Sequence, residues 1–246
     1  MQWLKTMLNQ AVIDHGKNVL QSTMAILCID TMPVGEMLPL LSEHISEQQI
    51  TYLTLLGNKT RAEVLAQYGA DDDASEPTIL ALLADFQRVR LSRYKIEQAL
   101  HAILKVLDNQ GFEVILLLSH VRFHGLHTAN AMLLEPERLI PPLVASIVGG
   151  HQVGVILPQP EFQAGQEAKW GRLYMSPVYG LANPLTQDDD ALVATGRKML
   201  DQGADVLVLD SPCYHTKHRD LLQKALDVPV LLSNSLVARL ASEIMN

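Results

Sequence analysis

Short, uninterrupted runs of apolar residues recur along the chain, and polar residues separate them. Strands that are apolar at every position are typical of parallel sheets, because such strands are buried on both faces. The pattern predicts strands at Met24–Ile29, Ile50–Leu55, Val114–Leu118, Val153–Leu157, Val178–Leu181, Val206–Leu209 and Val230–Leu232.

Segments with helical periodicity lie between these strands. They are Gly35–His44, Ser92–Leu107, Pro136–Val148, Pro160–Arg172, Asp188–Gln202, Tyr214–Leu226 and Ser235–Met245. Strands that alternate with helices are typical of a doubly wound α/β protein with parallel sheets and right-handed crossovers. Between 57 and 77 the pattern predicts a long loop that contains a short helix, Arg61–Gln67.

The two halves of the chain contain similar segments, NQGFEVILLLS ending at Ser119 and DQGADVLVLDS ending at Ser211. Each combines a glycine after a helix with an apolar strand and a final serine. The likeness predicts two pseudosymmetric lobes with Ser119 and Ser211 at equivalent strand ends. Chance is the alternative, because glycine commonly ends a helix before a strand.

The first 23 residues precede the first predicted strand. Trp3, Leu4, Met7, Leu8, Val12 and Ile13 recur at helical spacing, which favours an amphipathic helix. The alternative is an extension ahead of the domain, with Met24 as the true start. Polar residues interrupt this segment, so it does not resemble a secretory signal.

Composition narrows the classes of partner. The formal net charge is −8, which argues against nucleic acid, because binding phosphates requires a basic face. No apolar run approaches the roughly 20 residues that cross a bilayer as a helix, so no membrane partner is expected. Small molecules remain as ligands. With Cys28 and Cys213 as the two cysteines, we expect a cytoplasmic protein without a structural disulfide.

Polar residues follow several predicted strands. Because ligands of open α/β sheets bind beyond the carboxyl ends of the strands, we expect a site there. Hydroxyls, amides and helix N-terminal N–H groups at such a place suit a carboxylate. Ordinary helix capping is the alternative explanation for each residue taken singly. The candidates are Asp30, Thr31, Ser119, His120, Pro158, Asp210, Ser211, Ser233 and Asn234.

Metal and cofactor motifs are weak or missing. Neither G-x-G-x-x-G nor G-x-x-x-x-G-K-[ST] is present, so no nucleotide cofactor is expected, and no G-x-S-x-G motif indicates a hydrolase. The aspartates at 71–73 lack EF-hand spacing and favour a solvated edge. Two groups of residues have side chains of the kind that bind metal ions. Polar positions in loops and at helix N-caps explain their presence better, so no metal is expected. These groups are His120, His124 and His127, and Cys213, His215 and His218.

Four segments resemble the AroM family: LEPERLIPPLV, HQVGVILP, QGADVLVLDS and HTKHRDLLQKALDVPVLLSNSLVARLASEI. The resemblance runs from about Ala25 to the C-terminus. That family is similar to the aspartate/glutamate racemase superfamily, which implies two α/β lobes with a substrate cleft between them. The implied boundaries are 24–120 plus 228–246 for the first lobe and 121–227 for the second.

The resemblance also implies acid/base catalysis. Racemisation needs two proton-transferring groups that flank the substrate, and the superfamily uses a thiol at the end of the third strand of each lobe. These positions match Ser119 and Ser211, whereas AroM-like proteins commonly carry cysteine at the second. An isolated hydroxyl is a poor base, which argues against two-thiol racemisation. Cys213 is an alternative thiol, with His120 as the opposing group.

Two functions follow. The first is an enzyme that isomerises, eliminates from or cleaves a small carboxylate, with Asp30, Thr31, Asp210, His215, Ser233 and Asn234 as substrate-binding residues. The second is a metabolite-binding or regulatory protein without chemistry, which the family name associates with aromatic amino-acid metabolism. A homodimer is one candidate assembly for both.

Overall fold

The computed structural model describes residues 23–30, 41, 45–71, 75–83, 87–163, 165–184, 186–211 and 213–245. Thr31, nearly all of the expected helix at 35–44 and the N-terminal segment as far as residue 22 lie outside the described residues. The chain divides into two compact units. Ile45–Glu135 belongs to the first, together with the first strand, and Pro136–Ser242 belongs to the second.

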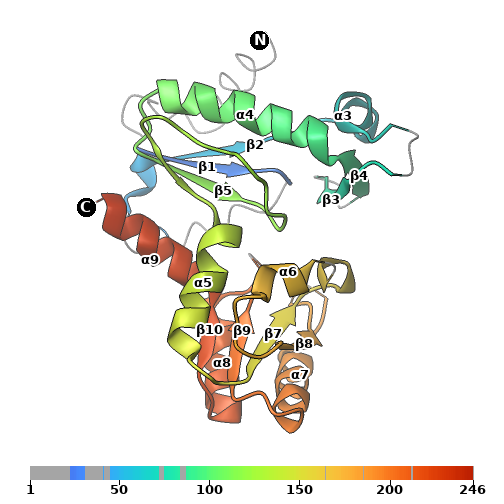
Figure 1. Ribbon diagram of the computed structural model, residues 1–246, viewed down its shortest axis with the longest axis vertical. Coiled ribbons are helices and arrows are strands. Elements are labelled where there is room, and N and C mark those ends of the chain that lie inside the picture. Colours follow the sequence, from blue (N-terminus) through green and yellow to red (C-terminus); the bar gives the residue numbers. More distant parts are fainter. Residues whose placement is uncertain are drawn as a thin grey trace. The chain divides into compact units, whose positions relative to one another are not determined.

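A four-stranded parallel sheet forms the centre of the first unit (Figure 1). Its order is β2-β1-β5-β6, and Met24 pairs with both Ile50 and Val114. Strands β1 and β5 are buried at every position, which explains their uninterrupted apolar sequences. The strands are β1 (Met24–Cys28), β2 (Ile50–Thr54), β5 (Val114–Leu118) and β6 (Met132–Leu134).

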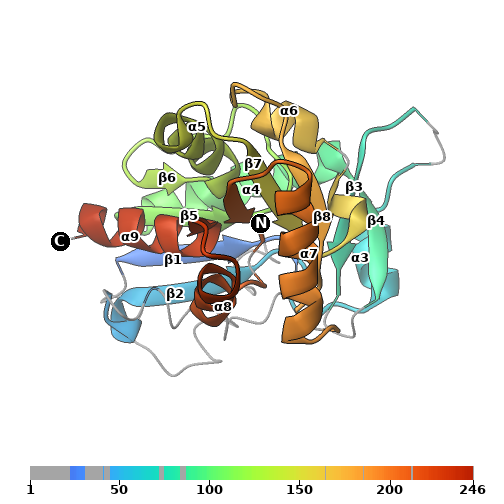
Figure 2. The ribbon, with the colours of Figure 1, turned by 90° about the horizontal axis from the view of Figure 1, so that it is seen from below.

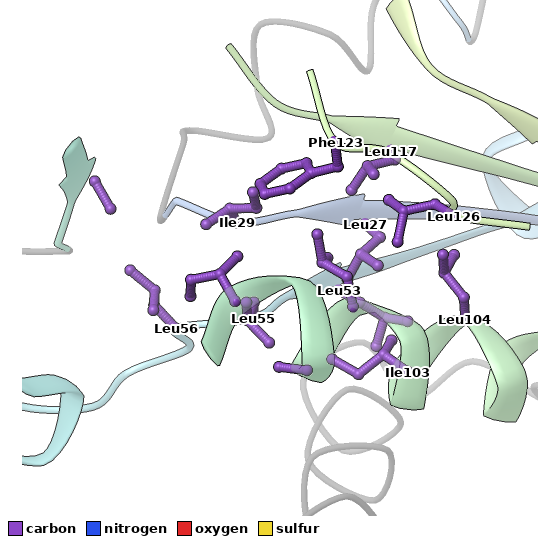
Figure 3. Packing of buried hydrophobic residues seen from close by; sticks show 14 of the residues in the cluster. Leu27, Ile29, Leu53, Leu55, Leu56, Ile103, Leu104, Leu117, Phe123 and Leu126 are labelled. Atoms are coloured by element: carbon purple, nitrogen blue, oxygen red, sulfur yellow. The ribbon is translucent and has the colours of Figure 1, made fainter. Parts of the chain in front are cut away.

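Helix α4 (Arg93–Asn109) covers one face of this sheet (Figure 1). The Ser92 side chain caps it by accepting from the Lys95 amide. Apolar residues three and four apart form its buried face, and Figure 3 shows Leu27 and Leu53 pointing toward Ile103 and Leu104. Two short helices, η3 (Glu47–Gln49) and α3 (Arg61–Tyr68), complete the helices of this unit among the described residues.

A separate antiparallel hairpin follows the predicted loop at 57–77, in a stretch for which the sequence predicted no element. Strands β3 (Thr78–Leu82) and β4 (Arg88–Ser92) pair with each other and with no other named strand of the described chain. Figure 2 shows the hairpin beside α3. Its odd-numbered residues Ile79, Ala81 and Leu83 belong to the core of the first unit.

The second unit contains another four-stranded parallel sheet, with the order β10-β9-β7-β8. Helices α7 and α8 pack against each other and against β8 and β10 (Figure 1). The strands are β7 (Val153–Leu157), β8 (Val178–Leu181), β9 (Val206–Leu209) and β10 (Val230–Leu232). The helices are α5 (Pro136–Val148), η4 (Pro160–Gln163), α6 (Gln166–Trp170), α7 (Asp189–Asp201), α8 (Thr216–Leu226) and α9 (Ser233–Met245).

The two sheets have the same strand order when β1, β2, β5 and β6 are matched with β7, β8, β9 and β10. The prediction of a pseudosymmetric α/β fold is therefore confirmed. The two repeated segments contain β5 and β9, which are equivalent strands of the two sheets. Among the described helices, none is both long and apolar enough to span a bilayer.

The boundaries differ from those implied by the resemblance. Strand β10 pairs with β9, so the chain from 228 to Ser242 lies in the second unit and not the first. Strand β6 pairs with β5, which keeps the chain as far as Glu135 in the first unit. A strand belongs to the sheet that satisfies its main-chain hydrogen bonds, and those bonds determine both corrections.

Candidate functional site

Asp30 and His120 lie side by side beyond the carboxyl ends of β1 and β5. Each residue comes two positions after its strand, and Cys28 pairs with Leu118 in the register of the sheet. The His120 Nδ1 atom is 3.5 Å from Asp30 Oδ2. The sequence predicted both residues separately, and the structure brings them together.

The hydrogen bonds of His120 determine where its protons lie. Nε2 is 2.9 Å from the Leu80 carbonyl oxygen, which can only accept, so Nε2 carries a hydrogen. The lone pair of a neutral ring would then be on Nδ1, facing a carboxylate that also carries lone pairs. Attraction therefore requires one further proton between Nδ1 and Oδ2, held by either group.

Burial raises the pKa of Asp30, and the His120 charge and the Leu82 amide partly offset that effect. Only 10% of the Asp30 side chain is exposed, against 28% for His120. Among the described residues, buried Asp30 Oδ1 has no hydrogen-bond partner. The pair thus combines a carboxyl that favours its proton with a partly accessible imidazole, as general acid/base chemistry requires.

Ser119 is less suited to catalysis. Its hydroxyl donates to the Val121 carbonyl at 2.9 Å and accepts from the Val121 amide at 3.0 Å. Both bonds close a local turn, so this hydroxyl acts as a loop constraint.

The nearby thiol of Cys28 accepts from Tyr52 Oη at 3.1 Å, and burial raises its pKa to about 12, which makes it an inert thiol.

The second unit contains a buried ion triad that the sequence did not predict. Lys169 Nζ lies 2.7 Å from Asp210 Oδ2 and 2.5 Å from Glu137 Oε1. The Ser233 hydroxyl donates to Asp210 Oδ1 at 3.1 Å. Between 6% and 12% of each charged side chain is exposed. The predicted strand-end residues Asp210 and Ser233 therefore do meet, but a lysine from α6 completes their network.

Charge limits what this triad can bind. Burial lowers the pKa of Lys169, but the Asp210 and Glu137 charges outweigh it and the net shift is upward, so the ammonium stays charged. With both carboxylates ionised, the triad carries one net negative charge. Lys169 is consequently already neutralised and is a poor primary receptor for an anion.

The loop after β9 is held by Asn234. Its side-chain amide donates to the carbonyls of Ser211 at 3.1 Å and Tyr214 at 3.0 Å. Cys213 Sγ is 3.3 Å from Ser211 Oγ, and 5% of Cys213 is exposed. Asn234 thus has a structural role in fixing the loop, and the Cys213 thiol is packed against the Ser211 hydroxyl.

His215 and His218 form the start of α8. His218 Nδ1 accepts from the His215 amide at 2.9 Å, so the ring acts as a capping group. Burial, with Lys217 and His215 nearby, lowers the pKa of His218 to about 4. The ring is therefore neutral near pH 7, and its role is structural.

The histidines at 120, 124 and 127 do not share a helical face. The chain from Ser119 to Ala131 contains no helix, and His127 Nδ1 bonds the Gly125 carbonyl at 3.0 Å. Within the described ranges, no group of three or more His, Cys, Asp and Glu side chains is arranged to hold a metal ion. Neither histidine group is therefore assembled as a metal site.

Comparison with known proteins identifies relatives of this chain. The family model described as AroM protein matches residues 24–245. No curated protein matches. A crystal structure of arylmalonate decarboxylase is similar, with 12% identity, coverage of 91% of this chain and 92% of that one, and a TM-score of 0.54. Glutamate racemase from Aquifex pyrophilus has 14% identity, coverage of 91% and 84%, and a TM-score of 0.51. These likenesses support the racemase-like two-lobed α/β fold.

Proposed function

The chain belongs to the AroM protein family, and we propose that it binds a small carboxylic acid beside Asp30 and His120, beyond the carboxyl ends of the strands, and catalyses proton transfer on it. The reaction class is isomerisation, elimination or carbon–carbon bond cleavage. His120 is the proton-transferring group, and Asp30 orients its ring and shares its proton.

The Asp30–His120 pair is the observation that carries this proposal. It lies beyond two adjacent parallel strands, where α/β proteins bind ligands, and it holds one proton between two groups of unlike acidity. When the pair has lost its shared proton, His120 Nδ1 is the base and accepts a proton from the carbon beside the substrate carboxyl. The electron pair of the broken C–H bond moves into that carboxyl, and the proton returns to the carbon or exchanges with water.

The names of the structural relatives support the substrate class. Arylmalonate and glutamate are both carboxylic acids, and both reactions change a bond at the carbon beside a carboxyl group. Because Lys169 is already paired, we propose main-chain amides and helix N-termini at the strand ends as the principal carboxylate donors. Thr31 and His215 remain candidates for substrate contacts.

Isotope exchange tests the reaction. The protein is incubated with C4 to C6 carboxylic acids in deuterated water, and deuterium beside the carboxyl group is followed by NMR and mass spectrometry. We expect exchange with at least one acid and its loss in His120→Gln. His124→Gln, which removes an exposed imidazole from the same loop, is the matched control and keeps the exchange. An absence of exchange across the panel counts against the enzyme.

A specific observation favours a second candidate, a metabolite-binding protein without chemistry. Both residues at the expected thiol positions are serines, and the Ser119 hydroxyl is occupied by Val121. Ser211 is packed against Cys213. A protein that retained the ligand site but lost catalysis would show this arrangement. The association of the family name with aromatic amino-acid metabolism gives the first compounds to screen.

Thermal shift measurements separate the two candidates. A binder is stabilised by a carboxylate metabolite, and the stabilisation persists in the Ser211→Ala/Cys213→Ala protein with no turnover. Stabilisation that accompanies isotope exchange supports the enzyme instead.

Compartment and assembly belong to the same proposal. Cys28 and Cys213 are both buried thiols that form no disulfide, as in proteins of a reducing compartment, and we place the protein in the cytoplasm. We propose a homodimer as its assembly. Light scattering after gel filtration checks the dimer, and a monomer mass across the micromolar range would exclude it.

A further inference from the structure

The outer edge of β3 faces away from its partner strand. The Leu83 amide donates to the Gln87 carbonyl at 2.9 Å, and the Arg93 amide donates to the Pro77 carbonyl at 3.0 Å. In an antiparallel pair, hydrogen-bonded positions alternate with positions whose main-chain groups point outward. Thr78, Leu80 and Leu82 hold the outward positions of β3.

Two of these outward groups meet the acid/base pair. The Leu80 carbonyl accepts from His120 Nε2 at 2.9 Å, and the Leu82 amide donates to the Asp30 carboxyl. A carbonyl and an amide two residues apart on one edge are the groups that a neighbouring strand would engage. Asp30 and His120 therefore occupy the place of a neighbouring strand along β3.

We propose that β3 is a positioning element for the Asp30–His120 pair, in which the Leu80 carbonyl fixes the Nε2–H tautomer and the Leu82 amide holds the Asp30 carboxyl in place. The proton that the pair shares then lies between His120 Nδ1 and Asp30 Oδ2. This inference rests on the proposed acid/base function of the same pair, and it adds a role for main-chain groups outside both strand ends.

The surroundings make β3 a firm support. Ile79, Ala81 and Leu83 anchor its other face in the hydrophobic core. Burial raises the pKa of Cys28 and of Tyr52, so both groups near Asp30 stay neutral. On β4, Arg88 and Arg90 stand opposite Leu82 and Leu80. Both arginines are exposed and belong to the strand on the opposite edge of β3 from the pair.

Nitrogen-15 NMR of the histidine rings tests the tautomer directly. The chain has nine histidines, and the His120 signals are assigned by their loss in His120→Gln. We expect the neutral ring to carry its hydrogen on Nε2, the nitrogen that faces the Leu80 carbonyl. A neutral ring protonated on Nδ1 in the wild-type protein overturns the proposal without any variant of β3.

The role of the Leu82 amide is tested by Leu82→Pro, with Leu82→Ala as the matched control. Proline removes the N–H that donates to Asp30 and is tolerated at outward positions of a strand edge, whereas alanine keeps the amide and loses the side chain. Without that donor Asp30 holds the shared proton more tightly, so the His120 Nδ1 resonance moves toward that of an unprotonated nitrogen relative to Leu82→Ala.

Superimposable His120 Nδ1 resonances in the proline and alanine variants contradict the proposal. A proline variant that does not fold leaves the wild-type tautomer as the deciding measurement. The expected tautomer and shift without isotope exchange support the positioning role and count against the enzyme. Exchange with the opposite tautomer supports the enzyme and overturns the positioning role.

Discussion

At the residue scale, Lys169 is the buried cation of the second unit, and its removal tests the ion triad. Lys169→Met leaves Asp210 and Glu137 buried without their shared counter-charge. Removing one partner of a buried ion pair typically costs about 3–5 kcal/mol, and we expect a loss of that size in the free energy of unfolding. Urea denaturation followed by circular dichroism measures it.

Lys105→Met is the matched control, because Lys105 is exposed on α4 and the same substitution there changes stability by less than about 0.5 kcal/mol. Glu137→Gln should cost less than Lys169→Met, since it leaves Lys169 paired with Asp210. Equal stability of the Lys169 and Lys105 variants would show that the triad does not stabilise the second unit.

His218 makes the stability of the protein depend on pH. Its pKa is about 4 in the folded protein, because of burial, against about 6.5 in an unfolded chain. Between these values the unfolded chain binds a proton that the folded protein refuses. The contribution of His218 is therefore present above about pH 6.5 and is lost as the pH falls toward 4.

His218→Gln isolates this effect, because glutamine at the same helix position can still accept the His215 amide. We expect the decline in melting temperature between pH 6.5 and 4 to be shallower in this variant than in wild type. His124→Gln controls for the loss of an exposed imidazole. A decline identical to wild type in His218→Gln would refute the assignment.

The sequence predicted the strand-end residues individually but not their partners. Asp210 was identified because it follows an apolar strand, which is a local signal. Lys169 and Glu137 lie in helices far from it along the chain, and only the packing of α5 and α6 brings their charges to Asp210. Lys169 and Glu137 each place a charged residue in the pattern of a predicted helix, and this is the weak signal that the sequence contains for them.

At the scale of elements, Asp108 connects the end of α4 to the loop that precedes β6. Its carboxylate accepts from the amides of Ala129, Asn130 and Ala131 at 2.7–2.9 Å. These bonds, the Ala131 amide first, lower the pKa of Asp108. An acidic residue near a helix C-terminus is unfavourable with the helix dipole, so the three amides explain its presence there.

Asp108→Ala should release this loop. We expect faster hydrogen exchange at Ala129, Asn130 and Ala131 and a lower melting temperature, while exchange in β7 is unchanged. Asp108→Asn retains one acceptor oxygen and should give an intermediate rate. The contribution of the carboxylate is present above about pH 4 and is lost as the pH falls, so wild type should approach Asp108→Asn in acid.

The β3–β4 hairpin shows what periodicity missed. Residues 88–92, with the sequence RVRLS, alternate polar and apolar side chains as a half-buried strand should, and every second residue from Val89 is buried. The predicted loop ended at Pro77, and no strand was predicted between it and the helix that begins near Ser92. Strand pairing joins residues that are apart in the sequence, so periodicity alone does not predict it. A two-stranded hairpin also has no further neighbouring strand that would help to fix its register.

At the scale of the whole molecule, the repeated segments allowed the pseudosymmetric pair of sheets to be predicted, but the boundary implied by the resemblance differs from the one that strand pairing favours. The repeated segments identify which strands are equivalent, but they do not show which strand pairs with β10, the last strand of the chain. Strand β10 is three residues long, and only its pairing with β9 assigns it to the second sheet. Sequence periodicity contains no information on that pairing.

The corrected boundary predicts which fragment of the chain folds alone. Pro136–Met245 contains all four strands of the second sheet and a continuous core, within the usual size of a domain. We expect this fragment to unfold cooperatively and to show dispersed amide signals by NMR. The shorter fragment 136–227 corresponds to the boundary implied by the family resemblance, and it lacks β10 and α9.

The shorter fragment should remain unfolded, because it loses more than an edge strand. Val230 and Leu232 leave the core, and the main-chain groups on the β10 side of β9 lose their partners. Ser233 and Asn234 also no longer hold Asp210 and the loop after it. Each buried group left without a partner costs about 1–3 kcal/mol, and together these losses exceed what a small domain has in reserve. Cooperative unfolding of 136–227 would instead favour the boundary implied by the family resemblance, with β10 outside the core of the second unit.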